Sequence, residues 1–224
     1  GEKMSDHIDL IEIKSGVKFL WDDKETFTIT SDFPKLSNEI ARLEKSHING
    51  LNSFLKINSQ RYDIAFEKLL NRNLDNPVKW GTGLGAKELF SGSMFKSMYK
   101  DLGVHFKSRY IKEAFGSYAM YLGGSPFKIP GFFSILPYGE IAYGLWMPKG
   151  GIYSLIEKLE EILIKIGVKI YKDSPVKEIA IKDNKVFGII TNDGDLKNYD
   201  TVVSNVDLPT TEEKLLKNNS LNSF

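Results

Sequence analysis

Apolar and polar residues alternate in three short runs near the start of the chain, at residues 7–13, 17–21 and 26–30. Alternation with a period of two is typical of strands with one covered face. The polar residues 22–25 between the second and third runs predict a turn. We therefore expect these residues to form an antiparallel meander.

The period changes at Pro34, and apolar residues then recur at helical spacing at Ile40, Leu43, Ile48 and Leu51. Ser31 or Asp32 is expected to cap this helix, with Pro34 in its first turn. We expect further helices over residues 86–100 and from residue 108 to about 122. Residues 35–145 are thus predicted to be largely helical.

The last third of the chain contains one helical pattern and a series of strand patterns. Apolar residues of 152–166 form one helical stripe that ends at Gly167. Short strands are expected at 168–173, 175–183, 185–191 and 196–200, separated by turn sequences such as KDNK and NDGD. Residues 201–205 (TVVSN) form an apolar run typical of a strand buried in a parallel sheet. A polar helix and tail are expected over 208–224.

Residues 121–146 are dense in glycine, proline and aromatic residues, and only Lys128 and Glu140 are charged there. Such a stretch forms either buried core with turns or the lining of an apolar pocket. Both interpretations stay open from the sequence. Glu140, the single carboxylate of the stretch, is the residue we name for acid or base chemistry, although the pattern itself assigns no catalytic residue.

Composition excludes several classes of protein. The formal net charge is +1 over 224 residues, which argues against a broad nucleic-acid interface. The chain has no cysteine, so disulfides, thiolate metal sites and cysteine nucleophiles are excluded. No apolar run approaches the roughly 20 residues of a membrane-spanning helix, and the first residues do not resemble a signal peptide. We expect a cytoplasmic protein; residues 1–3, which precede Met4, fit either an expression remnant or a longer chain.

The glycines of residues 81–85 match the spacing G-x-G-x-x-G/A, with Ala86 in the last position. A dinucleotide-binding loop must also follow a buried strand and open a helix. The preceding residues, NLDNPVKW, do not have the pattern of a strand, so we interpret the segment as a plain loop. The three histidines, His7, His47 and His105, lie far apart in the sequence and predict no metal site.

Two other segments are candidates for binding. Residues 147–151 (MPKGG) place Gly150 and Gly151 directly before a helix, where a ligand can approach the backbone. The segments SPVKEI and VVSNVD lie at predicted strand ends, where nucleotides bind in doubly wound sheets.

The ordered motifs YLGGSPF, YGEIAYGLWMPKGG, V-x-G-I-x-T-x-D-G and D-x-V-V-S-N-x-D resemble those of the phytoene desaturase family. These are FAD-dependent flavoproteins of carotenoid biosynthesis within the flavin amine oxidase clan. The resemblance is strongest over residues 121–207. It implies a mixed α+β and α/β fold: a substrate-binding domain over residues 1–146, part of a Rossmann-like FAD domain with a β-meander over 147–207, and a polar C-terminal helix and tail.

The resemblance also implies site residues. Val176, Ser204, Asn205, Gly150 and Gly151 would contact FAD, and Lys149 would lie near the flavin ring and the substrate. An apolar tunnel would bind a polyene by burial alone. Its lining would be aromatic: Phe127, Phe132, Phe133, Tyr138, Tyr143 and Trp146.

The chain departs from the family pattern because the N-terminal Rossmann segment and the C-terminal FAD segment are absent from it. We therefore expect a middle portion of a phytoene dehydrogenase-like oxidoreductase that neither holds FAD tightly nor turns over alone. The alternatives are an amine oxidase or polyene saturase of the same clan, or a non-catalytic module that binds a hydrophobic ligand. A lipid-like substrate also implies peripheral contact with a membrane.

Overall fold

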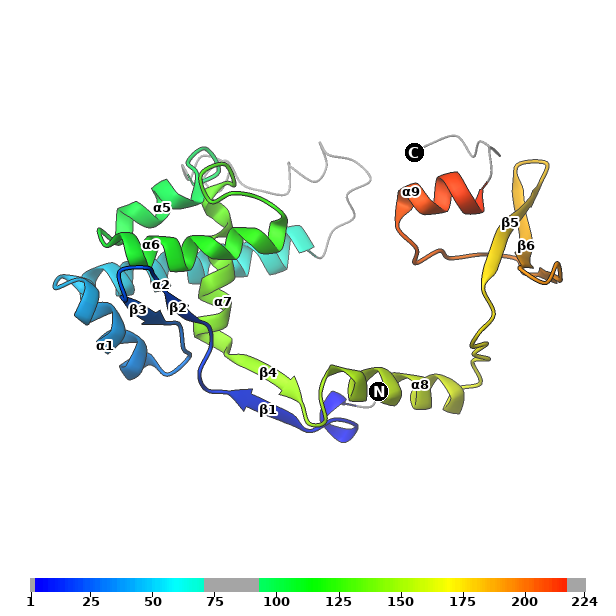
Figure 1. Ribbon diagram of the computed structural model, residues 1–224, viewed down its shortest axis with the longest axis horizontal. Helices are drawn as coiled ribbons and strands as arrows, with labels where there is room; N and C mark the ends of the chain where they lie inside the picture. Colours follow the sequence, from blue (N-terminus) through cyan, green and yellow to red (C-terminus); the bar gives the residue numbers. More distant parts are fainter. Residues whose placement is uncertain (1–2, 71–92, 217–224) are drawn as a thin grey trace. The chain divides into compact units, whose positions relative to one another are not determined.

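The computed structural model describes residues 3–70 and 93–216, and the chain divides into two compact units, Gly1–Lys158 and Leu159–Phe224 (Figure 1). The predicted domain boundaries after residues 146 and 207 stay predictions. The glycine-rich segment 81–86 lies outside the described residues.

The first unit begins with η1 (Met4–Asp6) and the strands β1 (Leu10–Ile13), β2 (Lys18–Leu20) and β3 (Thr26–Thr28). Strands β2 and β3 form the predicted antiparallel hairpin. The expected three-stranded meander is wrong for β1, which pairs instead with β4 (Leu145–Pro148). Alternation of apolar residues predicts a strand but does not specify its partner, and here the partner lies far along the chain.

The predicted N-terminal helix is divided into α1 (Phe33–Leu43) and α2 (His47–Ile64). Asp32 caps α1 as predicted, because its side chain accepts a hydrogen bond of 3.1 Å from the Lys35 backbone amide. The break occurs at Glu44, which has an extended backbone. Its carboxylate accepts hydrogen bonds from the backbone amides of Lys107 (2.8 Å) and Ser108 (2.9 Å), so a tertiary contact ends the helix.

Between α2 and β4, the described residues of the first unit are mainly helical. It contains η2 (Ala65–Leu70), a π-helical continuation of α2, and then α5 (Met98–His105) and α6 (Arg109–Gly116). The helix expected at 86–100 thus begins only at Met98 within the described residues. The chain continues through η3 (Ser117–Leu122), η4 (Gly131–Ser134) and α7 (Ile135–Tyr143). Helices α2, α5 and α6 lie side by side, and α7 contacts α2 (Figure 1).

The core of this unit is built on fully buried aromatic residues. The ring of Phe54 lies 5.1 Å from that of Phe115 and 5.6 Å from that of Phe106, and Phe115 lies 6.1 Å from Phe27. These rings join α2, α5, α6 and β3 in one apolar cluster. Burial of this area supplies most of the stabilisation that holds the helices together.

The second unit contains a three-stranded antiparallel sheet: β5 (Val176–Lys182), β6 (Lys185–Thr191) and β7 (Leu196–Asn198). The predicted meander is confirmed. Asp183 and Asn184, between β5 and β6, have φ values of +51° and +60°, which is typical of a two-residue hairpin turn. Helix α8 (Ile152–Lys165), also predicted, crosses the boundary between the units, and α9 (Leu208–Thr210) and η5 (Thr211–Leu215) follow the sheet.

Two predicted strands are wrong. Residues 168–173 and 201–205 have no strand conformation, and the apolar side chain of Val203 is 89% exposed. An apolar strand needs a hydrogen-bonded neighbour to form a ladder, and these segments pair with no strand within the described part of the chain.

No helix within residues 3–70 and 93–216 is long and apolar enough to cross a membrane.

A candidate ligand cavity

The first unit contains an apolar cavity of about 700 Å³. Its walls come from α2, η2, η3, η4 and α7, together with the residues that lead into β4. A volume of this size is within the usual range for small-molecule sites. The lining residues are Tyr62, Ala65, Phe66, Leu70, Met94, Tyr118, Tyr121, Leu122, Phe132, Phe133, Ile135, Leu136, Gly139, Glu140, Tyr143, Gly144 and Leu145.

The lining has an exposed rim and a buried end. At the rim, Tyr121 is 66% and Leu70 67% exposed. At the buried end, Tyr118 is 4% and Glu140 9% exposed. The exposed part of the lining is thus apolar, and its polar pair, Tyr118 and Glu140, is buried.

Stacked tyrosine and phenylalanine rings form one wall of the cavity. The Tyr62 ring lies 4.4 Å from Phe66, 5.1 Å from Tyr143 and 5.7 Å from Tyr138, measured between ring centroids. Tyr62 and Phe66 lie one helical turn apart, so their rings meet on the same face. These contacts join α2 and η2 to α7 and fix the shape of the wall.

Two polar side chains at the buried end are hydrogen-bonded to each other. The Tyr118 hydroxyl donates to Oε2 of Glu140. Burial raises the pKa of Glu140, and the hydrogen bond from Tyr118 opposes this shift. Burial, with the hydrogen bond to Glu140, also raises the pKa of Tyr118. Among the described residues, Oε1 of Glu140 has no hydrogen-bond partner.

The aromatic residues predicted from the sequence occupy three kinds of position. Phe132, Phe133 and Tyr143 line the cavity. Tyr138 is buried in the core beside it and contacts the rings of Tyr62 and Tyr143. The other two are more than half exposed: Phe127 packs on Tyr99, and the Trp146 indole donates to the Tyr143 carbonyl.

Sequence reasoning missed the part of the lining that lies outside the aromatic stretch. Tyr62 and Phe66 lie outside the leucine and isoleucine stripe that predicts the helix. Their spacing of four residues is the signal that would have revealed them.

The glycines Gly150 and Gly151 form a turn between β4 and α8. Their φ values are +92° and +91°, a region that residues with side chains rarely adopt, so the turn itself requires both glycines. A side-chain carbon on Gly151 would meet nothing within 4 Å. The backbone at Gly151 is therefore accessible, and its contact with a cofactor stays a prediction.

The remaining residues predicted to contact a cofactor belong to the second unit, whereas Lys149 and the two glycines belong to the first. Val176 begins β5 and pairs with Thr191. Ser204 and Asn205 lie in the irregular segment before α9, where the Ser204 hydroxyl is 2.9 Å from that of Thr211. The structure thus describes the position of each of these residues within its own unit, and their contacts with a cofactor stay predictions.

Comparison with known proteins agrees with this architecture. The sequence pattern of the family described as "Flavin containing amine oxidoreductase" matches residues 17–223, which is nearly the whole chain. The chain belongs to this family. It is similar to the phytoene desaturase of Phycomyces blakesleeanus, with 30% identity over 96% of this chain and 38% of that protein. It is also similar to the zeta-carotene-forming phytoene desaturase of Myxococcus xanthus, with 27% identity over 96% of this chain and 42% of the relative.

The chain spans about two fifths of the length of these curated relatives. Among solved structures, the chain is similar to an oxidoreductase from Methanosarcina mazei. The alignment covers 93% of this chain and 44% of the other, with a TM-score of 0.44 and 16% sequence identity.

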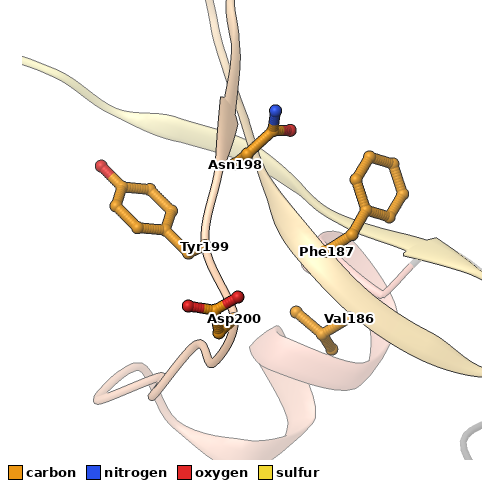
Figure 2. A pocket seen from close by; sticks show the side chains of 5 residues that line it. All are labelled: Val186, Phe187, Asn198, Tyr199 and Asp200. Atoms are coloured by element: carbon orange, nitrogen blue, oxygen red, sulfur yellow. The ribbon is translucent and has the colours of Figure 1, made fainter.

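A second hollow lies on the small sheet of the second unit. Figure 2 shows the side chains that line it, which come from β6, β7 and the residues just after β7. It is shallow, with Phe187 and Tyr199 both partly exposed. Its only carboxylate is Asp200, so the hollow contains no acid–base pair. No group of three histidine or acidic residues in the described ranges is placed to hold a metal. The cavity of the first unit is therefore the stronger candidate site.

Proposed function

We propose that this chain forms the substrate-binding region and part of the flavin-binding region of an FAD-dependent oxidoreductase that desaturates a carotenoid or related isoprenoid polyene. The observation that supports this function best is the aromatic cavity of about 700 Å³ in a member of a flavin oxidoreductase family. Relatives named phytoene desaturase, with similarity along 96% of the chain, favour a polyene over other apolar ligands.

Binding of such a ligand would depend on apolar area alone. A hydrocarbon chain makes no hydrogen bonds, so its affinity comes from burial at about 25 cal/mol per Å². Tyr62, Phe66 and Tyr143, whose rings are in contact, would pack on the chain together, and Phe132 and Phe133 would add further aromatic contacts. Rings of this kind supply large contact areas with little loss of side-chain freedom. They would also exclude water from the reacting carbons.

FAD is the cofactor that the family implies, and we propose Gly150, Gly151, Val176, Ser204 and Asn205 as its contacts in this chain. Lys149 would lie near the flavin and the substrate. When bound, FAD would accept the hydride removed from the substrate. Most of these contacts are backbone or hydroxyl groups without charge, so we expect the 224-residue chain to purify without stoichiometric flavin, as judged by its visible absorbance.

The exposed rim would meet the membrane in which such a substrate is dissolved. Phe66, Leu70, Tyr121 and Leu122 are apolar and exposed at the cavity entrance. An apolar patch of this kind is suited to peripheral contact with a lipid surface. Flotation with phosphatidylcholine vesicles tests this contact, and a chain that stays with the soluble fraction would contradict it.

The function is tested by expressing the chain in a host that accumulates phytoene and measuring the phytoene that co-purifies. Phe66→Asp places a charge on the cavity wall and should abolish co-purification, because an apolar chain cannot solvate a carboxylate. Leu20→Asp is the matched control, since Leu20 is 74% exposed and lies outside the cavity. Equal amounts of phytoene with both variants, or none with the wild type, would overturn the proposal.

A further inference from the structure

Two segments of the first unit, residues 94–100 and 120–128, lie side by side at its surface. They are held together by the backbone, because the amide of Tyr99 donates a hydrogen bond of 3.0 Å to the carbonyl of Pro126. The rings of Tyr99 and Phe127 also pack on each other, with 4.7 Å between their centroids. We call the surface that these two segments form the lysine–aromatic face.

Large apolar side chains protrude from this face. Phe95 is 77%, Tyr121 66% and Phe127 65% exposed, and Met120 and Leu122 are exposed as well. Single apolar residues are normal on a protein surface, but a group of them on adjacent segments indicates an interaction site. Tyr121 and Leu122 also line the rim of the cavity, so the face is continuous with the cavity entrance.

The charged side chains on this face all have the same sign. Lys96, Lys100 and Lys128 are exposed, and neither segment contains an aspartate or a glutamate. Within the part of the chain that the structure describes, none of these three lysines forms an ion pair. Asp101, which follows Lys100, is buried in its ion pair with Arg61 and does not neutralise the face. The face therefore presents positive charge next to exposed apolar side chains.

Resting on the proposed function, we propose that the lysine–aromatic face binds the surface of an anionic lipid bilayer. The apolar side chains would enter the boundary between headgroups and acyl chains, and the lysines would pair with the anionic headgroups. A second copy of the same face would instead place like charges opposite each other. A lipid surface satisfies the apolar and the basic side chains together, and it brings the cavity entrance to the phase that dissolves a polyene.

The test measures how the 224-residue chain partitions between buffer and two kinds of vesicle. One kind is pure phosphatidylcholine, and in the other about one third of the lipid is phosphatidylserine. Each lysine near an anionic surface strengthens binding about fivefold, so three lysines predict roughly 30- to 100-fold tighter binding to the anionic vesicles. Because this gain is electrostatic, about 1 M salt, at which the screening length falls to about 3 Å, should remove most of it.

Reversal of the lysine charges tests the electrostatic part. Lys96→Glu, Lys100→Glu and Lys128→Glu together should abolish the preference for anionic vesicles while leaving binding to phosphatidylcholine unchanged. The matched control makes the same change at three exposed lysines outside the face, Lys18, Lys45 and Lys56. It alters the net charge equally and should retain most of the preference.

Removal of two aromatic rings tests the apolar part. Phe95→Ser combined with Phe127→Ser should weaken binding to both kinds of vesicle by about 10-fold, because apolar burial does not depend on the charge of the lipid. If this double variant binds anionic vesicles as tightly as the wild type, the face is a purely electrostatic surface suited to an acidic soluble partner. That result would overturn the inference.

Equal binding of the wild type to the two kinds of vesicle would overturn this inference and leave the proposed function intact, because contact with phosphatidylcholine suffices for that function. An unchanged preference in the triple lysine variant would also overturn it. If the chain binds neither kind of vesicle, the inference fails together with the proposed membrane contact. Co-purification of phytoene then tests the polyene cavity separately.

Discussion

The buried ion pair between Arg61 and Asp101, which does not itself line the cavity, should be the polar contact whose loss destabilises the first unit most. Arg61 Nη1 lies 2.6 Å from Oδ2 of Asp101 and Nη2 lies 3.1 Å from Oδ1, so the contact is bidentate. The two side chains are only 12% and 7% exposed. Nη1 also approaches the carbonyl of Gly131 at 3.5 Å. The pair thereby links α2, α5 and η4, and two of these elements line the cavity.

Arg61→Leu removes the cation and leaves the Asp101 carboxylate buried without a partner. Loss of one member of a buried pair costs about 3–5 kcal/mol, much of it the desolvation of the remaining charge. For a unit of this size, that loss corresponds to a fall in melting temperature on the order of 10 °C. All three tryptophans, Trp21, Trp80 and Trp146, lie in the first unit, so fluorescence during urea unfolding reports on it directly.

Two further variants identify the cause of the loss. Arg61→Leu combined with Asp101→Leu should recover most of the stability, because no charge is then left unpaired. The control is Arg109→Leu. Arg109 contacts Asp23 at the same 2.6 Å, but the two side chains are 58% and 42% exposed, and water can solvate both charges. A similar loss for Arg61→Leu and Arg109→Leu, or no recovery in the double variant, would refute the reasoning.

Three further predictions concern packing and pH. Gly50→Ala should lower the free energy of urea unfolding by about 1–3 kcal/mol, because the added carbon would lie 2.3 Å from the His105 carbonyl oxygen. Gly103→Ala is the control and should not lower it, because the nearest atom to its added carbon would be 4.0 Å away. Phe115→Ala should cost about 3–5 kcal/mol, since the ring is fully buried among other rings, and a loss below about 1 kcal/mol would contradict this core. The raised pKa of Glu140 means that the folded state holds its proton above the ordinary value of 4.5, so the stability of the wild type should fall relative to Glu140→Gln as pH rises above 4.5. A constant difference between pH 4 and pH 9 would show that this group does not titrate as described.

Local features of the fold could be predicted from the sequence. Helix α8 and the strands β5, β6 and β7 follow from periodicity and from turn residues such as Asp183 and Asn184, which tolerate positive φ. Periodicity and turn preference depend only on residues that are close in the sequence, so they can be recognised without the rest of the fold.

Long-range features could not be predicted. The partner of β1 is β4, about 130 residues later, and nothing in either sequence specifies that pairing. The helix break at Glu44 depends on amides at 107 and 108, and the cavity wall depends on a contact between Tyr62 and Tyr143. The apolar segments 168–173 and 201–205 have the composition of strands but form none, because a strand also needs a neighbouring strand to pair with.

The most direct test of the account is photo-crosslinking from within the cavity. Phe133, which lines it, is replaced by p-benzoylphenylalanine, and the chain is irradiated in membranes that contain phytoene. The account predicts a mass increase equal to one phytoene at position 133 and none when the same group replaces the exposed Leu20. Equal labelling at the two positions, or no adduct at position 133, would contradict the claim that this cavity holds the polyene.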